Sequence, residues 1–390
     1  MRFQYICSDC GKHYEISPEM MVCPICCANQ DLRKPLRGIL EVALEGEVTT
    51  NFDIFDLLPV ERKYFPDLLV GNTPLFKPER LNKSIGFDNL YIKNDSLNPT
   101  GSLKDRASYL VAAFTKKHGI KDIVLASTGN AGSSMAGIGA SADLNVFLFL
   151  PKDAPSAKLV QAIQYGADVR RVNGNYDMAY GLSMKYVAEH GGLSRNTAYN
   201  PMTIEGKKTI ALEMFKQMGT APDYVFVPVG DGVIVSGVFK GFKDLYKLGL
   251  IKKMPIIVSV QAEGSSAIAQ AVEAGDFGQP VESDTVADSI SVDVPRGGYY
   301  ALRQIKEFDG ICSVVSDDAI LKAQMALSRS GGVFAEPAAA ASYAGFLKEK
   351  DKLPKDAKIV VLITGHGLKD IASASKEIEI PEKLYESSGG

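Results

Sequence analysis

Short segments rich in apolar residues recur along most of this chain, and each is followed by a cluster of polar or turn-forming residues. Segments of this length predict strands at 123–126, 146–150, 169–172, 225–229, 256–260 and 359–363. Between them the apolar spacing changes. Ala107, Leu110, Val111 and Phe114 recur at i, i+3, i+4 and i+7, which is one face of a helix. Strands that alternate with helices predict an α/β fold with largely parallel sheets.

The chain of 390 residues exceeds what one hydrophobic core usually organises, so at least two domains are expected. We expect a small α/β domain at 106–200 and a large α/β domain built from 71–105 and 201–375. A connecting arm at 36–70 would hold a strand at 37–42 and a short helix at 56–65. The tail at 376–390 ends in small residues, 387–390, and we expect it to be disordered.

Charge and hydropathy exclude several classes of partner. The net charge is −3 and the basic residues are dispersed, so neither nucleic acid nor an anionic membrane is expected as a partner. No apolar run has transmembrane length, and cysteines stand where the apolar part of a signal peptide would begin. We therefore expect a cytoplasmic protein.

The first 35 residues form a separate module with paired cysteines. Cys7 and Cys10 make one CxxC motif, and Cys23 and Cys26 make a second. Four thiolates at this spacing predict a tetrahedral, structural Zn²⁺ site, a zinc ribbon whose folding energy comes from the metal. Cys27 competes with Cys26 as the fourth ligand, and His13 is a further alternative. Disulfides are the competing interpretation, but cytosolic thiols stay reduced. Without a basic run, a structural or oligomer-contact role is favoured over nucleic-acid binding.

A turn-rich loop at 98–103 delivers Lys104 to the first turn of the helix at 107–114. Unpaired N–H groups and the positive dipole end of a helix disfavour an ammonium there, so the lysine pKa falls and its amine becomes nucleophilic. A solvated surface lysine is the alternative, and three further segments argue against it.

Each of these segments follows a predicted strand. Ser127, Thr128, Gly129, Asn130 and Ala131 precede a helix of small residues, which is a typical site for a carboxylate. A glycine loop follows the strand at 225–229, where successive backbone N–H groups can converge on a phosphate; it contains Gly230, Asp231, Gly232, Val233 and Ile234. Thr364 ends the last strand. An ordinary strand-to-helix turn is the alternative for the loop at 127–131, and the glycine loop gains weight only from its order in the chain.

The order of these four segments resembles that of fold-type-II pyridoxal-phosphate enzymes, and most closely that of the threonine synthase family. Further similar segments lie at 71–75, 90–93, 200–209 and 334–338. The resemblance implies two open α/β lobes around a central cleft, and a carbon-oxygen lyase that acts on a phosphorylated amino acid. It also implies a homodimer or higher homo-oligomer.

The resemblance further implies roles for individual residues. Pyridoxal 5′-phosphate would be attached to Lys104, which would also transfer protons. Asn130 would bind the 3′-oxygen of the cofactor, the loop at 230–234 its phosphate, and Thr364 would face its ring nitrogen. The loop at 127–131 would hold the substrate carboxylate. Lys93 is the candidate cation for the substrate phosphate, with Lys207 and Lys208 near it in sequence order.

Two departures from the family keep alternatives open. Thr203 stands where the family carries an arginine that can bind phosphate in a bidentate manner, and Arg296 is the candidate replacement. Asp231 is unexpected beside a dianion. The leading hypothesis is threonine synthase, which forms L-threonine from O-phospho-L-homoserine and water. The alternatives are a paralogue such as cysteate synthase, which uses O-phosphoserine and sulfite, a serine or threonine dehydratase, and a non-catalytic zinc-ribbon regulator.

Overall fold

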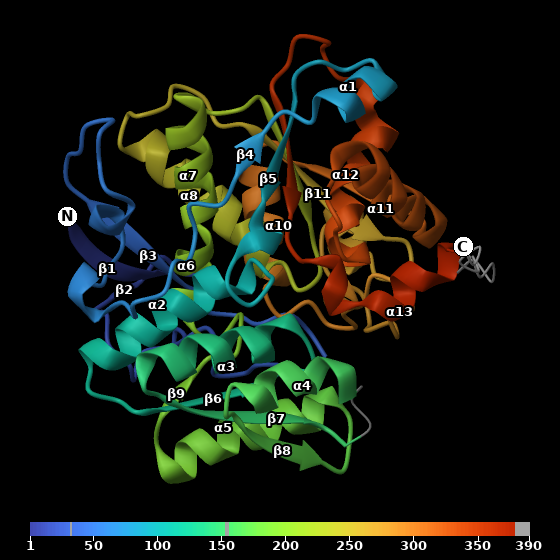
Figure 1. Ribbon diagram of the computed structural model, residues 1–390. Coiled ribbons are helices and arrows are strands. Elements are labelled where there is room, and N and C mark those ends of the chain that lie inside the picture. Colours follow the sequence, from blue (N-terminus) through green and yellow to red (C-terminus); the bar gives the residue numbers. More distant parts are fainter. Residues whose placement is uncertain (32, 153–155, 379–390) are drawn as a thin grey trace, which may run out of the picture.

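Strands and helices alternate along most of the chain in the computed structural model, which describes residues 1–31, 33–152 and 156–378 (Figure 1). The end of the expected tail, including 387–390, lies outside the described residues. In the described part of the chain, no helix combines the length and the apolar character that crossing a membrane requires.

The largest sheet has six strands in the order β12-β11-β10-β13-β5-β4. Only β4 is antiparallel to its neighbour. The strands are β4 (Leu75–Phe76), β5 (Leu90–Asn94), β10 (Tyr224–Pro228), β11 (Ile256–Ala262), β12 (Ile311–Val315) and β13 (Ile359–Ile363). The predictions at 225–229, 256–260 and 359–363 are confirmed to within two residues. A parallel sheet needs crossover helices, which here are α1 (Glu79–Ile85), α7 (Thr209–Met218), α8 (Val233–Lys247), α9 (Ala267–Ala274), α10 (Gly298–Glu307), α11 (Asp317–Gly331) and α12 (Pro337–Glu349).

Strand β13 is buried on both faces, as its continuous apolar run predicts. Ile359, Val361 and Ile363 pack into one hydrophobic cluster, whereas Val360 and Leu362 pack into another. Side chains of a strand alternate between the two faces of a sheet, so these two clusters are the cores above and below it. Helices therefore cover both faces.

The second sheet has four parallel strands in the order β8-β7-β6-β9. They are β6 (Asp122–Ala126), β7 (Asn145–Pro151), β8 (Asp168–Val172) and β9 (Leu193–Ser194). The helices α2 (Lys104–Lys117), α3 (Asn130–Ala142), α4 (Ser156–Gln164) and α5 (Tyr176–His190) accompany this sheet, and α6 (Pro201–Lys207) leads back to the first (Figure 1). The three strands predicted between 123 and 172 are confirmed.

The N-terminal strands β1 (Arg2–Cys7), β2 (His13–Tyr14) and β3 (Leu40–Glu45) form an antiparallel sheet in the order β2-β1-β3. Strand β3 begins three residues later than predicted. Tyr5 and Val42 belong to the same hydrophobic cluster as Leu110 and Phe114 of α2. The cysteine-rich module is therefore packed onto the rest of the protein.

The helix predicted at 56–65 is wrong. Two 3-10 turns stand there instead, η1 (Ile54–Leu57) and η2 (Arg62–Tyr64). Pro59 lies between them and disfavours a helical conformation of the preceding residue, Leu58, whose ψ is 146°. Shorter elements elsewhere are η3 (Asp95–Leu97), η4 (Asp288–Ile290), η5 (Lys350–Lys352), η6 (Gly367–Lys369), α13 (Ile371–Ala374) and η7 (Ser375–Glu377).

Candidate active site

The lysine loop and two of the polar loops meet in one cavity of about 390 Å³. The carboxyl ends of β6 and β10 open directly into it, as ligand sites of parallel sheets do. Among the predicted site residues, those that line it are Lys104, Ser127, Thr128, Gly129, Asn130, Ala131, Gly230, Asp231, Ile234 and Arg296. Gly232 and Val233 also belong to the predicted glycine loop, but they do not line the cavity.

Lys104 is the first residue of α2, and its position is fixed by the end of β13. The N–H of Leu103 donates to the carbonyl oxygen of Thr364 at 2.8 Å, and the N–H of His366 donates to the carbonyl oxygen of Gly101 at 3.0 Å. Thr364 is buried and is not part of the cavity wall, but this bond places it directly beside the lysine loop. Two segments more than 250 residues apart in sequence thus form one unit.

The amine of Lys104 has a lowered pKa, mainly because burial disfavours its charged form. Asp231 and Glu336 oppose this shift, and the charge of Arg195 adds to it. Burial, rather than the helix N-terminus that the sequence suggested, is therefore the main cause of the lowered pKa of Lys104. A lysine whose neutral form is favoured is a nucleophile and can also accept a proton.

Asn130 is the first residue of α3 and is held by a carboxylate that the sequence analysis did not place in the site. Its side-chain amide donates to both oxygens of Glu336, at 2.9 and 3.0 Å, and to the hydroxyl of Ser289 at 3.2 Å. Glu336 is buried at the start of α12, in a segment (334–338) that already resembled the family. That resemblance was the available signal for Glu336, whereas Ser289 carried none.

The loop at 127–131 has the form expected of an anion site. The hydroxyl of Ser127 accepts the N–H groups of Gly132 at 3.0 Å and Gly129 at 3.3 Å, which fixes the turn. The N–H groups of Asn130 and Ala131 have no hydrogen-bond partner among the described residues. Unpaired donors at the positive end of a helix favour a carboxylate.

The glycine loop is partly suited to a phosphate. Gly232 has a φ of 88° and precedes α8, and the N–H groups of Gly232 and Ile234 have no partner in the described part of the chain. However, Oδ1 of Asp231 accepts the N–H of Val233 at 3.1 Å. One N–H group of this loop, that of Val233, is therefore already hydrogen-bonded to a carboxylate of the protein.

Arg296 lies in the cavity wall and connects two parts of the fold. Its guanidinium forms an ion pair with Asp177 at 2.8 Å, and Asp177 lies in the first turn of α5. Tyr176 and Tyr180 of α5 also line the cavity, with the ring of Tyr180 near the guanidinium. Both tyrosines were missed in the sequence, although a spacing of four residues places them on one helix face.

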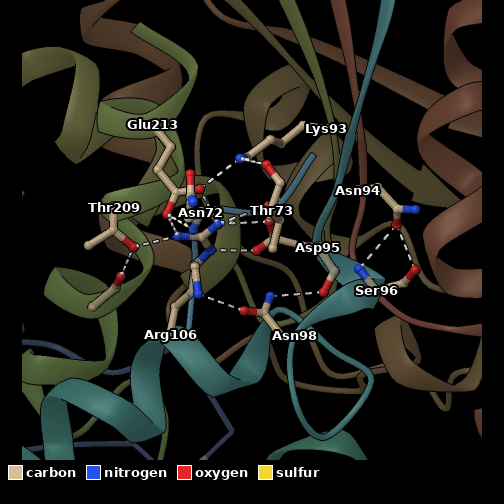
Figure 2. A network of polar contacts seen from close by, with 12 residues as sticks. Asn72, Thr73, Lys93, Asn94, Asp95, Ser96, Asn98, Arg106, Thr209 and Glu213 are labelled. Carbon is tan, nitrogen blue, oxygen red and sulfur yellow. Dashed lines mark hydrogen bonds and ion pairs between the residues drawn. The ribbon is translucent and has the colours of Figure 1, made fainter. Parts of the chain in front are cut away.

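Lys93 does not reach this cavity. Figure 2 shows it in a buried polar network, where its ammonium donates to Glu213 and to the carbonyl oxygen of Thr73, both at 2.7 Å. The side chain of Gln217 accepts a further hydrogen bond from this ammonium at 3.0 Å. Strand β5 points this side chain toward α7 rather than toward the loops. The structure thus corrects the assignment of Lys93 as a substrate ligand.

Arg106 is the centre of that network (Figure 2). Its guanidinium donates to both oxygens of Glu213 at 2.7 Å and pairs with Asp95 at 2.5 Å. Burial alone would raise the pKa of Glu213, but the charges of Arg106 and Lys93 hold it at about 2. Because Arg106 follows Lys104 by two residues, this network also fixes the start of α2.

The other residues considered for the substrate phosphate are buried. Thr203 is fully buried, and its hydroxyl donates to the carbonyl oxygen of Asn200 at 2.9 Å. Lys208 forms ion pairs with Glu205 and Asp244. Lys207 is also buried, but the described residues offer its ammonium no hydrogen-bond partner.

The cysteines of the N-terminal module converge. The Sγ atoms of Cys7, Cys10, Cys23 and Cys26 all lie within 4.8 Å of one another, a geometry that can hold a metal ion. Among the described residues, neither Cys27 nor His13 joins this group. Nearest sulfurs are 3.7 and 3.8 Å apart, well beyond the length of a disulfide, and all these cysteines are free.

Comparison with solved structures agrees with this architecture. The processed form of threonine deaminase isoform 2 from Solanum lycopersicum matches with a TM-score of 0.70 at 23% identity, over 86% of this chain and 96% of that chain. Maize serine racemase matches with a TM-score of 0.68 at 22% identity, over 76% and 88%. At these identities the likeness shows the fold, which is that of fold-type-II enzymes.

Sequence comparison identifies the family. The family described as "Pyridoxal-phosphate dependent enzyme" matches residues 67–365. The threonine synthase of Methanocaldococcus jannaschii is 34% identical over 97% of this chain and 96% of its own length. That of Synechocystis sp. is 36% identical over 80% of this chain and 83% of its own. The chain therefore belongs to the pyridoxal-phosphate dependent enzymes and, within them, to the threonine synthase family.

Proposed function

We propose that the protein converts O-phospho-L-homoserine and water into L-threonine and phosphate. The observation that carries the proposal is Lys104, whose amine has a lowered pKa and which lies in the wall of a cavity shared with two loops that each lead into a helix N-terminus. Threonine synthases that are 34 to 36% identical over most of the chain support this reaction.

The residues present suit pyridoxal 5′-phosphate. Lys104 would hold it covalently, Asn130 would lie beside it, and the loop at 230–234 would bind its phosphate. The side of the ring that carries the nitrogen would lie toward Thr364. When bound, the cofactor supplies an electron sink that makes protons at Cα and Cβ of an amino acid acidic. A hydroxyl, unlike a carboxylate, does not favour a protonated ring nitrogen, which suits elimination chemistry.

Lys104 would carry the protons of the reaction. Burial favours the neutral form, so at neutral pH a larger fraction of this amine than of an ordinary lysine is unprotonated and available to accept a proton. The loop at 127–131 would hold the substrate carboxylate through the unpaired N–H groups of α3. We assign the substrate phosphate to the side of the cavity near Arg296, which would exchange its ion pair with Asp177 for the phosphate.

A panel of substrates tests the proposal and separates its alternatives. Purified, cofactor-loaded protein is offered O-phosphohomoserine, O-phosphoserine with and without sulfite, and unphosphorylated serine or threonine. We expect phosphate and threonine from O-phosphohomoserine. Sulfite-dependent release of phosphate from O-phosphoserine would indicate a cysteate-forming enzyme. Formation of a 2-oxo acid from serine or threonine would indicate a dehydratase.

We also propose that the four clustered cysteines bind one structural Zn²⁺. Their Sγ atoms lie close enough for a shared tetrahedral ion, and four sulfur ligands leave no open position for catalysis. Reduced thiolates suit the cytoplasm, which we propose as the compartment. Assembly into a homodimer or higher oligomer is proposed from the resemblance to the family alone, and gel filtration with light scattering tests it.

A further inference from the structure

Among the residues that the structure describes, two buried basic side chains near the cavity form no ion pair with a carboxylate, whereas other buried basic side chains do. Lys93, Lys208 and Lys240 are fully buried, and each forms an ion pair with at least one carboxylate. Lys207 is equally buried, yet no described residue accepts a hydrogen bond from its ammonium. The protein thus pairs three buried lysines and leaves the fourth unpaired.

The buried arginines show the same contrast. Arg106 is paired with Asp95 and Glu213 (Figure 2). The guanidinium of Arg195 is fully buried but contacts only two hydroxyls, those of Thr197 at 3.2 Å and Ser108 at 3.3 Å, and its Nε has no partner among the described residues. Burial lowers the pKa of Arg195 to about 10. A buried cation without an acid is costly unless an anion binds there.

Both residues belong to segments that pack beside the cavity. Thr197, which contacts Arg195, is itself part of the cavity wall. Lys207 ends α6, which is wedged between α2 and α8. Gly206 meets the backbone of Arg106, and Gly237 of α8 meets Lys207 so closely that a side chain at either glycine would collide. Lys207 therefore lies between the helix that begins with Lys104 and the helix that follows the glycine loop.

A phosphate bound at the glycine loop would require nearby positive charge, which Arg195 and Lys207 can supply. Asp231 brings a negative charge into the loop and accepts the N–H of Val233, so a phosphate there would face repulsion and one donor fewer. The negative charge of Asp231 acts to raise the pKa of both Arg195 and Lys207, although burial lowers both more strongly. Burial holds the pKa of Lys207 well below its ordinary value, and a dianion beside the loop would favour the protonated form of this amine as well as the charge of Arg195.

We propose that Arg195 and Lys207 form a buried binding site for a phosphate monoester dianion beside the loop at 230–232. The position next to this loop favours the phosphate of the cofactor as the dianion, and the phosphate of the substrate has the same chemistry. The inference rests on the pyridoxal-phosphate chemistry of the cavity and does not require threonine to be the product.

The test compares pyridoxal 5′-phosphate with pyridoxal, which lacks the phosphate but retains the aldehyde. Binding of each to cofactor-free protein is titrated through the visible absorbance of the lysine-bound compound, which needs no turnover. In Lys207→Met and in Arg195→Met, affinity for pyridoxal 5′-phosphate should fall about 10- to 100-fold while affinity for pyridoxal stays within about twofold. Lys208→Met is the matched control, because Lys208 is adjacent and equally buried but forms ion pairs with Glu205 and Asp244. The ratio of its affinities for pyridoxal 5′-phosphate and pyridoxal should equal that of the wild type.

A second arm identifies the source of the dianion. With cofactor held saturating, the KM for O-phosphohomoserine and the inhibition constant of homoserine are compared between the wild type and Lys207→Met. A rise in the first alone, with the cofactor preference unchanged, would assign the site to the substrate. If Lys207→Met changes neither the preference for pyridoxal 5′-phosphate over pyridoxal nor that for O-phosphohomoserine over homoserine, the proposal is overturned.

Stability gives an independent readout. Removing an unpaired buried amine should leave the melting temperature of the cofactor-free protein unchanged or raise it, and should reduce the increase in Tm that pyridoxal 5′-phosphate gives the wild type. If Lys207 served only to stabilise the fold, its replacement would instead lower the melting temperature of the cofactor-free protein. Failure of the cofactor-free Lys207→Met protein to fold would therefore contradict the proposal.

Discussion

The backbone N–H of Leu103 donates to the carbonyl oxygen of Thr364 at 2.8 Å. This one bond joins the lysine loop to the end of β13, the central strand whose residues pack into the cores on both faces of the large sheet. The residue that would hold the cofactor is therefore fixed by the most buried strand near it. Such rigidity favours a site whose reacting atoms must be held in place.

Replacing Lys104 should remove the covalent link to the cofactor. Lys104→Ala removes the amine, so the visible absorbance of lysine-bound cofactor should be lost and turnover should fall by at least 1,000-fold, in the range typical of a nucleophile or general base. Absorbance spectra and mass spectrometry of borohydride-reduced protein report the link. Lys117→Ala, near the other end of the same helix, should keep both.

Removing the charge of Glu336 should change the acidity of Lys104. The carboxylate raises the pKa of this lysine, so Glu336→Gln should lower it further. The rate at which pyridoxal 5′-phosphate attaches depends on the neutral amine, and its rise with pH should therefore move to lower pH in the variant. Glu282→Gln, at an exposed position, is the control. If the pH dependence of attachment moved to higher pH instead, the carboxylate of Glu336 would not be raising the pKa of Lys104.

The pair formed by Arg106 and Glu213 should stabilise the fold in a pH-dependent way. The pKa of Glu213 is about 2 in the folded protein against 4.5 ordinarily, so its contribution is complete above pH 4.5 and is lost as the pH falls toward 2. Glu213→Gln should cost about 3 to 5 kcal/mol at pH 7 because it leaves buried cations short of a partner.

Denaturant unfolding at pH 7 and at pH 3 measures this difference. The gap in unfolding free energy between the wild type and Glu213→Gln should narrow at the lower pH, because the wild-type carboxyl has begun to lose its advantage. An equal gap at both pH values would mean that the pairing contributes no pH dependence.

The N-terminal module should bind zinc and depend on it. We expect about one zinc per chain, and its removal by a chelator should lower Tm because β3, which pairs with β1, packs against α6. Cys23→Ser should reproduce the loss. Cys27→Ser is the matched control and should retain zinc, since Cys27 lies outside the cluster. Zinc loss in Cys27→Ser, or no zinc in the wild type, would refute the assignment.

The strands and loops of the site could be predicted because their signals are local. An apolar run followed by small polar residues identifies the end of a buried strand wherever it occurs, and this placed Lys104, Asn130 and Asp231 near one another. The helix expected at 56–65 does not form, because Pro59 disfavours a helical conformation of Leu58 and interrupts the segment.

Partners that are distant in sequence could not be predicted. The pattern around Lys93 does not show whether its side chain points to the cavity or to Glu213, because that depends on how β5 packs against α7. Arg195 carries no local signal of its role, and the only signal for Glu336 is the likeness of its segment, 334–338, to the family. The contact of Glu336 with Asn130 exists only once the two sheets are brought together. The contact of Arg195 with Ser108 joins residues 87 positions apart and exists only once α2 packs beside the segment that follows β9.

The central claim is tested most directly by the stoichiometry of products from O-phosphohomoserine. Phosphate and threonine are measured in the same reaction for the cofactor-loaded wild type and for Lys104→Ala. The account predicts one threonine per phosphate released by the wild type, and neither product from the variant. Release of phosphate without threonine, or turnover that survives in Lys104→Ala, would contradict it.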